Sequence, residues 1–108
     1  MTISFGNSKG GLLMCYEIKN SDQHIDVLLT GIISVQEATS IRQKLFPLIQ
    51  QRFHSLTFHL GTVTELDSSG LGLLLAVQKI AMDCNAHVAF KDVNAQLKER
   101  LNMAGITL

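Results

Sequence analysis

The chain has 108 residues, of which 46% are hydrophobic and 17% charged, and its nine basic side chains balance its nine acidic ones. This length predicts a single domain over residues 1–108, large enough to fold without a metal or disulfide. The balanced charge argues against a basic nucleic-acid-binding module and against an acidic solvating tail. The modest charged fraction argues against disorder.

Nothing in the sequence indicates export or membrane insertion. The longest apolar run, residues 71–77, is far shorter than the roughly twenty residues of a membrane span. Residues 1–11 lack the charged and apolar regions of a signal peptide. We therefore expect a cytoplasmic protein. Cys15 and Cys84 have no metal-ligand spacing, and we expect both to be reduced packing residues.

The first third of the chain has the alternation of β-strands. Residues 3–5 and 12–19 flank a glycine-containing turn at 7–11, which predicts a hairpin or an edge arm. A second turn at 20–23 leads into a short strand that ends at Thr30–Gly31, with alternating Ile25, Val27 and Leu29.

From about Val35 to Phe53 the periodicity becomes helical. The apolar stripe consists of Ala38, Ile41, Leu45, Leu48 and Ile49. Ser34 and Glu37 have the spacing of a capping box, which marks the start. Pro47 removes a backbone donor, so we expect a kink or a short break there.

The second half alternates strands and helices. We expect a strand at 55–60, a loop at 61–67, and a buried helix at about 69–84 that is apolar on more than one face. A strand at 87–91 precedes a helix capped by Asn94 and ended by Gly105, and residues 106–108 begin a last strand. Met82 and Met103, near the ends of the helical stripes, are expected in the core.

This order of elements predicts an α/β fold with a mostly parallel sheet and right-handed crossovers. Functional sites in such folds lie at the junctions between strand ends and helix starts, and residues 64–72 form one of them. Asp67, Ser68, Ser69 and Gly70 stand where a helix begins, so its free N–H groups and dipole favour an attached phosphate. A simpler reading is that Ser68 or Ser69 only caps the helix, and spacing alone favours that reading.

Two segments resemble STAS domains of bacterial anti-sigma factor antagonists. Leu66-Asp67-Ser68-Ser69-Gly70-Leu71-Gly72-Leu73-Leu74 resembles the family signature, and residues 97–106 resemble the last helix with its closing glycine. The spacing matches from about Ile25 to Ile106. The resemblance implies a STAS fold, with a mixed sheet of four to five strands and three to four helices.

The resemblance also implies a phosphorylation-controlled partner switch with no cofactor. Ser68 would be the phosphoacceptor of a GHKL-type serine kinase that is often also the anti-sigma factor, and a serine phosphatase would reverse the reaction. The unphosphorylated domain would bind its partner, as a monomer or weak dimer, and so regulate transcription or a related output. Asp67 would orient the serine or phosphate, Ser69 would cap the helix, and Gly70 and Gly72 would admit a partner backbone. The apolar first turn, with Leu71, could supply a groove for a partner helix.

One departure and two alternatives stay open. Family members commonly carry an acidic residue soon after the glycine that ends the second strand, whereas Gly31 is followed by Ile32-Ile33-Ser34. STAS-like domains also brace the ATPase of ABC-type lipid transporters, although those usually have Thr after the aspartate. A small-ligand or nucleotide sensor is the third reading.

The sequence shows no catalytic or metal-binding constellation of its own. His24, His54, His59 and His87 are scattered without metal-ligand spacing, and His59 and His87 are expected on polar strand faces. No glycine motif for nucleotide phosphates occurs, and no nucleophile, base and orienting group converge. We therefore expect neither an enzyme nor a metalloprotein.

Overall fold

The computed structural model describes residues 2–5, as a backbone strand, and residues 16–108. Five strands and three helices follow one another in these residues: β1 (Thr2–Phe5), β2 (Tyr16–Ser21), β3 (His24–Ile33), α1 (Val35–Ile49), β4 (Ser55–Leu66), α2 (Ser68–Asp83), β5 (His87–Lys91) and α3 (Ala95–Met103). The predicted hairpin is present as the antiparallel pair β1–β2, while residues 6–15 of the predicted turn and arm lie outside the described residues.

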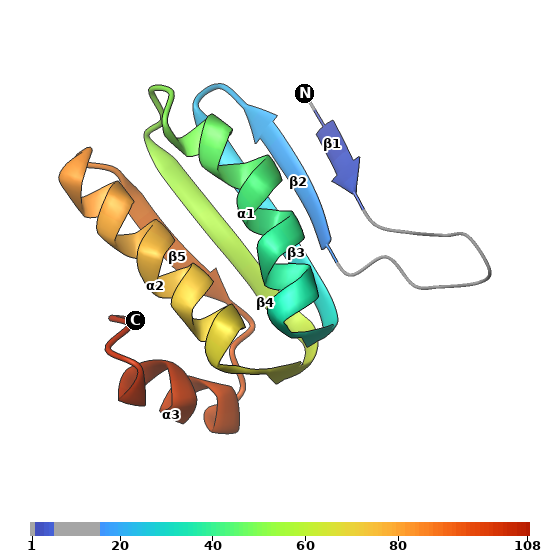
Figure 1. Cartoon of the computed structure of the whole chain (residues 1–108). Coiled ribbons are helices and arrows are strands. Elements are labelled where there is room, and N and C mark those ends of the chain that lie inside the picture. Colours follow the sequence, from blue (N-terminus) through green and yellow to red (C-terminus); the bar gives the residue numbers. More distant parts are fainter. Residues whose placement is uncertain (1, 6–15) are drawn as a thin grey trace.

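The strands form one sheet in the order β1-β2-β3-β4-β5. The pairs β1–β2 and β2–β3 are antiparallel, and β3–β4 and β4–β5 are parallel. The α/β class and the mixed sheet are confirmed, with parallel pairs making up half of the sheet. Figure 1 shows α1 and α2 side by side on one face of the sheet, with α3 beyond the end of β5.

The core lies between the sheet and helices α1 and α2. Alternate residues of β2, β3 and β4 point into it, as the period-2 pattern requires. They meet the apolar stripes of the helices, and the fully buried set includes Ile18, Ile25, Leu29, Ile41, Leu45, Leu56, Phe58 and Leu73. The intervening strand residues point to the opposite face, which we call the open face.

β4 is longer than the sequence indicated. Residues 61–66, expected as part of a loop, continue the strand to Leu66. They pair with β3 through register shifts between Leu28 and Thr30 and between Gly31 and Ile32. Such β-bulges interrupt the simple alternation of side chains. Only Asp67 therefore separates the end of β4 from the start of α2.

Helix α1 differs from expectation at its end. The capping box is confirmed, because the Glu37 carboxylate accepts hydrogen bonds from the Ser34 backbone N–H at 3.0 Å and from the Ser34 hydroxyl. These bonds, the hydroxyl first, lower the pKa of Glu37 despite partial burial. The helix ends at Ile49 rather than Phe53, and it continues through Pro47 without the short break.

The C-terminal helix confirms its predicted caps. The Asn94 side chain accepts a hydrogen bond from the Leu97 backbone N–H at 2.8 Å, and Gly105 has a φ of 89°. Residues 106–108 form no strand, so that prediction is wrong, although Ile106 is buried.

Three residues expected in the core are instead on the surface. Cys84 is exposed and free, and the methionines Met82 and Met103 are 70% and 81% exposed. They lie at the C-terminal ends of α2 and α3. Cys15 lies outside the described residues. No helix among the described residues is long and apolar enough to cross a membrane.

Candidate functional site

The predicted site lies where β4 ends and α2 begins. Asp67 is the N-cap of α2, and its carboxylate accepts a hydrogen bond from the Gly70 backbone N–H at 3.0 Å. The Asp67 backbone N–H donates to the Ile33 carbonyl oxygen at the end of β3, at 3.2 Å. The junction is therefore attached to two neighbouring strands and to the helix that follows.

This arrangement corrects the role expected for Ser69. The cap of α2 is Asp67 rather than Ser69, and α2 begins at Ser68, one residue earlier than expected. Asp and Ser are both good N-cap residues, so the sequence offers three consecutive candidates, Asp67, Ser68 and Ser69, and does not show which of them caps the helix. Because Asp67 already satisfies a helix N–H, neither serine is needed as the cap.

Gly70 also has a different role from the one expected. It is buried, and a Cβ built on it would lie 2.5 Å from Leu66 Cδ1 and 3.0 Å from the Ile33 carbonyl oxygen. Gly70 thus lets α2 pack against the ends of β3 and β4, and no partner backbone can approach it. Gly72 is exposed, and a Cβ there would meet nothing within 4 Å.

Ser68 is exposed at the first position of α2, and Ser69 beside it is half-buried. The free N–H groups and the dipole of the helix end favour negative charge at this place. Ser68 therefore combines an exposed position with surroundings that favour negative charge.

Two shallow grooves flank the start of α2. On the α1 side, a groove is lined by Val35, Ala38, Thr39, Arg42, Ser69 and Gly72. On the α3 side, a second is lined by Leu71, Arg100, Met103 and Ala104. Leu71, predicted to contact a partner, is half-buried and lines this second groove.

Two large apolar side chains near the β3–α1 connection are exposed. Ile32, at the end of β3, is 56% exposed, and Val35, at the start of α1, is 58% exposed. Exposed large apolar side chains grouped beside a groove are typical of protein–protein contact sites. Ile32 follows Gly31, where the family commonly has an acidic residue, while Ile33 is buried and Ser34 caps α1.

Sequence reasoning did not single out several residues of this surface. Val35, Thr39 and Arg42 recur at the helical spacing of four and three, so they share one face of α1 beside Gly72. That spacing was visible in the sequence, but only the fold shows that this face borders α2. Arg42 also lies over the Phe46 ring, 5.4 Å from its centroid, in a cation–π contact.

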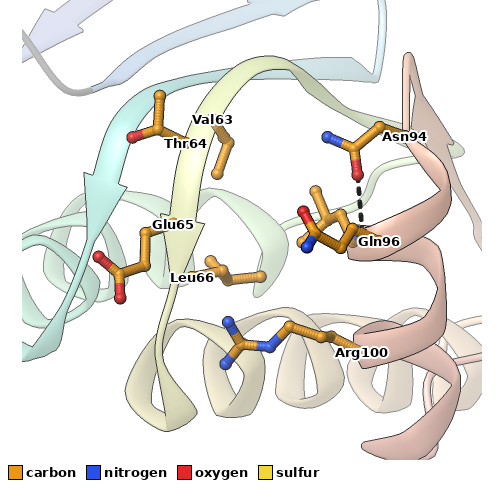
Figure 2. A pocket seen from close by; sticks show the side chains of 8 residues that line it. Val63, Thr64, Glu65, Leu66, Asn94, Gln96 and Arg100 are labelled. Carbon is orange, nitrogen blue, oxygen red and sulfur yellow. Dashed lines mark hydrogen bonds between the residues drawn. The ribbon is translucent and has the colours of Figure 1, made fainter.

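A further cavity of about 200 Å³ lies between the end of β4 and α3. Figure 2 shows Val63 and Leu66 of β4 facing Gln96 and Arg100 of α3 across it. It is separate from the two grooves, although Arg100 also lines the second one.

A polar cluster occupies the open face. Asp26 Oδ1 accepts hydrogen bonds from Nε2 of His59 at 2.9 Å and of His24 at 3.2 Å. His24 Nδ1 is 2.5 Å from Ser55 Oγ. Burial alone would raise the pKa of Asp26. The hydrogen bonds from His59 and His24, together with the charges of these histidines, lower the pKa by more than burial raises it, so the net shift is downward. His59 thus lies on a polar strand face, as predicted, and His87 is exposed.

The cluster is not a metal site. No group of three or more His, Cys, Asp or Glu side chains among residues 2–5 and 16–108 is arranged to hold a metal ion. Its contacts join β3 to β4 near the starts of both strands, far along the strands from Ser68.

Comparisons with known proteins define the class. The family model described as "Mlab, STAS domain" matches residues 17–107, so the chain belongs to this STAS-domain family. The STAS resemblance seen in the sequence is thereby confirmed.

One curated relative and one similar solved structure are described as anti-sigma factor antagonists. The chain is 27% identical over 90 residues to the anti-sigma-B factor antagonist of Bacillus subtilis (strain 168), covering 83% of this chain and 82% of that protein. Its fold is similar to that of Bacillus SpoIIAA in the phosphorylated form, with a TM-score of 0.74 at 16% identity over 84% of both chains. Unphosphorylated SpoIIAA, described as an anti-sigma factor antagonist, gives a TM-score of 0.75 at 16% identity, covering 84% of this chain and 81% of that one.

Proposed function

We propose that the chain is a phosphorylation-controlled partner-switching protein with Ser68 as its phosphoacceptor. The observation that carries this proposal is the exposed Ser68 hydroxyl at the first position of α2, directly after the capping Asp67. The similarity to anti-sigma factor antagonists supports it. The unphosphorylated form binds an anti-sigma factor that is also a GHKL-type serine kinase, and phosphorylation releases that partner.

The chemistry at Ser68 is a phosphoryl transfer performed by the partner. The bond between Ser68 Oγ and the γ-phosphorus of ATP forms, the bond from that phosphorus to the leaving ADP oxygen breaks, and a base of the kinase takes the hydroxyl proton. A serine phosphatase restores the hydroxyl by hydrolysis. The chain is the substrate in both steps and supplies no catalytic group.

The switch works through the docking surface rather than through unfolding. A phosphoserine carries about −1.5 to −2 charges at neutral pH. Ser68 is exposed at the start of α2; its neighbour Ser69 and the exposed Val35 line the groove on the α1 side, and Leu71 lines the other groove. A partner that covers this surface would bury the new charge, and an unpaired buried charge costs about 3–5 kcal/mol. That corresponds to a loss of roughly two or more orders of magnitude in affinity.

The sequence after Gly31 lacks the acidic residue common in the family, which favours a partner contact at this edge that is more apolar than in other family members. Exposed Ile32 takes that place at the end of β3. We infer that the partner of this chain presents an apolar side chain at this edge rather than a basic one. Ile32→Asp should therefore weaken binding, whereas a basic partner contact would make it stronger.

The test uses the purified chain with ATP and the serine kinase that co-purifies with it. Mass spectrometry should place one phosphate on Ser68, and Ser68→Ala should abolish it while keeping partner binding. Ser68→Asp should weaken binding by at least about 100-fold. Ser69→Ala is the matched control, and it should still be phosphorylated and released.

Two outcomes would contradict the proposal. One is phosphate on another residue with Ser68→Ala switching normally. The other is co-purification with a transporter ATPase and no kinase, which would favour the alternative of a STAS subunit that braces an ABC-type lipid transporter.

A further inference from the structure

β4 has a long stretch of edge without a strand beside it. β5 pairs only with the first part of β4, from Ser55 opposite His87 to His59 opposite Lys91. β4 continues to Leu66, and its other edge is paired with β3 over most of this length. Beyond His59, no strand in the described part of the chain pairs with the edge that faces α3. Main-chain donors and acceptors of a strand edge are thus available there.

The chain after β5 leaves this edge open instead of covering it. It turns at Asp92, whose φ is 60°, and passes close to Gly61, where a Cβ would lie 3.0 Å from Asp92 Cβ. The following helix α3 then lies across from residues 63–66, and the cavity of about 200 Å³ separates the two. We call it the β4–α3 cavity.

The β4–α3 cavity combines an apolar floor with a cationic mouth. Val63, Leu66 and Leu97 are buried apolar residues of its lining. Gln96 and Arg100 lie one turn apart on α3 and extend toward β4 (Figure 2). The Asn94 side chain already accepts a hydrogen bond from Leu97.

Arg100 gives the cavity its charge preference. Its guanidinium makes no ion pair with any described residue. Glu65 is the acidic residue of the lining, but Figure 2 shows its carboxylate on the other side of β4 from Arg100. At about 200 Å³, the cavity is smaller than the roughly 300–1,000 Å³ of sites that enclose drug-sized ligands, so a peptide bound along the β4 edge can place only part of itself inside it.

We propose that the β4–α3 cavity binds a short, extended, acidic peptide segment of a partner protein. The segment adds to the free edge of β4 by main-chain hydrogen bonds, places an apolar side chain against Val63 and Leu66, and offers a carboxylate to Arg100. This contact does not involve Ser68 and holds whether or not Ser68 is phosphorylated, so it goes beyond the proposed function.

The test is an NMR titration of the ¹⁵N-labelled full chain with blocked tetrapeptides. The probe is acetyl-Val-Asp-Val-Thr-amide, and the comparison is the same peptide with Asn in place of Asp. Saturable shifts should appear at residues 62–66 and 96–101. The acidic peptide should bind about tenfold tighter, as expected for a charge-assisted hydrogen bond.

Four variants separate this proposal from its alternatives. Arg100→Gln should abolish the preference for the acidic peptide, while Lys98→Gln, which removes the same charge from the same helix outside the cavity, should keep it. Gln96→Glu should weaken the binding of the acidic peptide, because it places a carboxylate one helical turn from Arg100. Ser68→Asp should leave the titration unchanged, so failure of the phosphorylation proposal would not affect this result.

The proposal is overturned if neither peptide gives saturable shifts or if the shifts map to other elements. It is equally overturned if Arg100→Gln and Lys98→Gln affect the preference alike, because the discrimination would then be a general effect of net charge.

Discussion

Asp67 and Gly70 are the two residues that hold the start of α2 against the sheet. Asp67 supplies the cap and the backbone contact to Ile33, and Gly70 supplies the space for Leu66. Both act inside the domain, although their place in the sequence signature suggested contacts with a partner. Ser68 lies between them in the sequence with an exposed side chain, and its hydroxyl is not needed to cap the helix.

The cap gives a direct stability prediction. Asp67→Ala should lower the free energy of unfolding by about 0.5–2 kcal/mol, because the Gly70 N–H loses its acceptor. Urea unfolding followed by circular dichroism measures the change. Ser69→Ala should cost less than Asp67→Ala, and the reverse order would show that a serine is the true cap.

The two glycines of α2 should respond oppositely to alanine. Gly70→Ala should destabilise the fold by about 1–3 kcal/mol, because the new methyl group would overlap Leu66 and crowd the Ile33 carbonyl. Gly72→Ala should be neutral or stabilising by up to about 1 kcal/mol, because the site is open and alanine favours helix. Thermal unfolding of the pair measures the difference, and equal melting temperatures would contradict the close packing at Gly70.

The sequence predicted that Asp67 to Gly70 lie where a strand gives way to a helix, but not which of them caps that helix. The run from Asp67 to Gly70 marks a helix start by composition alone, because each residue type is common there. Which of these residues caps α2 depends on where β4 ends. The end of β4 is set by its pairing with β3, and the β-bulges in that pairing leave no periodic pattern in the sequence. Residues from other elements, such as Ile32, Arg42 and Arg100, needed the fold to bring them close.

At the scale of elements, the open-face cluster joins the two central parallel strands. Asp26 of β3 accepts from His59 of β4, and His24 of β3 contacts Ser55 of β4. The same register places Lys19 of β2 opposite Asp26, and Lys91 of β5 opposite His59. The Asp26 carboxylate thus contacts two imidazoles, and a lysine occupies the position opposite it on β2.

The lowered pKa of Asp26 predicts how stability depends on pH. Because the folded-state pKa lies below the ordinary value of 3.8, the carboxylate stabilises the fold above pH 3.8 and loses this effect as the pH falls through the folded pKa. Asp26→Asn should therefore cost about 1 kcal/mol near pH 7, and the difference from the unaltered chain should shrink below pH 3.8.

Urea unfolding at pH values from 7 to 3 tests this dependence. Asp22→Asn is the matched control, because Asp22 is an exposed turn residue with a φ of 51°, a conformation that Asn also accepts. The prediction would be contradicted if Asp26→Asn showed the same loss at every pH, or if Asp22→Asn behaved identically.

Elements with an undisturbed period were predicted well, and those that depend on tertiary contacts were not. β5 at His87–Lys91 and the start of α1 at Val35 match the expected bounds. The second half of β4 was assigned to a loop because Gly61, Thr62 and Thr64 interrupt the apolar alternation, while its pairing with β3 is non-local. Pro47 removes one backbone N–H donor in the last turn of α1, and the helix nevertheless continues to Ile49.

At the scale of the whole molecule, switching at Ser68 should leave the fold intact. The exposed side chain of Ser68 contributes little to packing, and a negative charge at this helix start is favourable by about 0.3–1 kcal/mol. Ser68→Asp should therefore unfold within about 0.5–1 kcal/mol of the unaltered chain while losing partner affinity.

Comparing the amide NMR spectra of Ser68→Asp and the unaltered chain tests this directly. Shifts should be confined to the start of α2 and the two grooves beside it. Shifts that extend to the open-face cluster would instead indicate a rearrangement of the sheet, and the surface mechanism would be wrong.

The position of Cys84 offers a practical handle on this protein. It is exposed at the far end of α2 from Ser68, and sixteen helical residues at about 1.5 Å each separate them by roughly 24 Å. With Cys15 replaced, a fluorophore or spin label on this thiol would sit outside the docking surface yet within range for distance measurements. Because the helix fixes the distance between the label and Ser68, the label would report association and release of a partner in real time without altering the Ser68 hydroxyl.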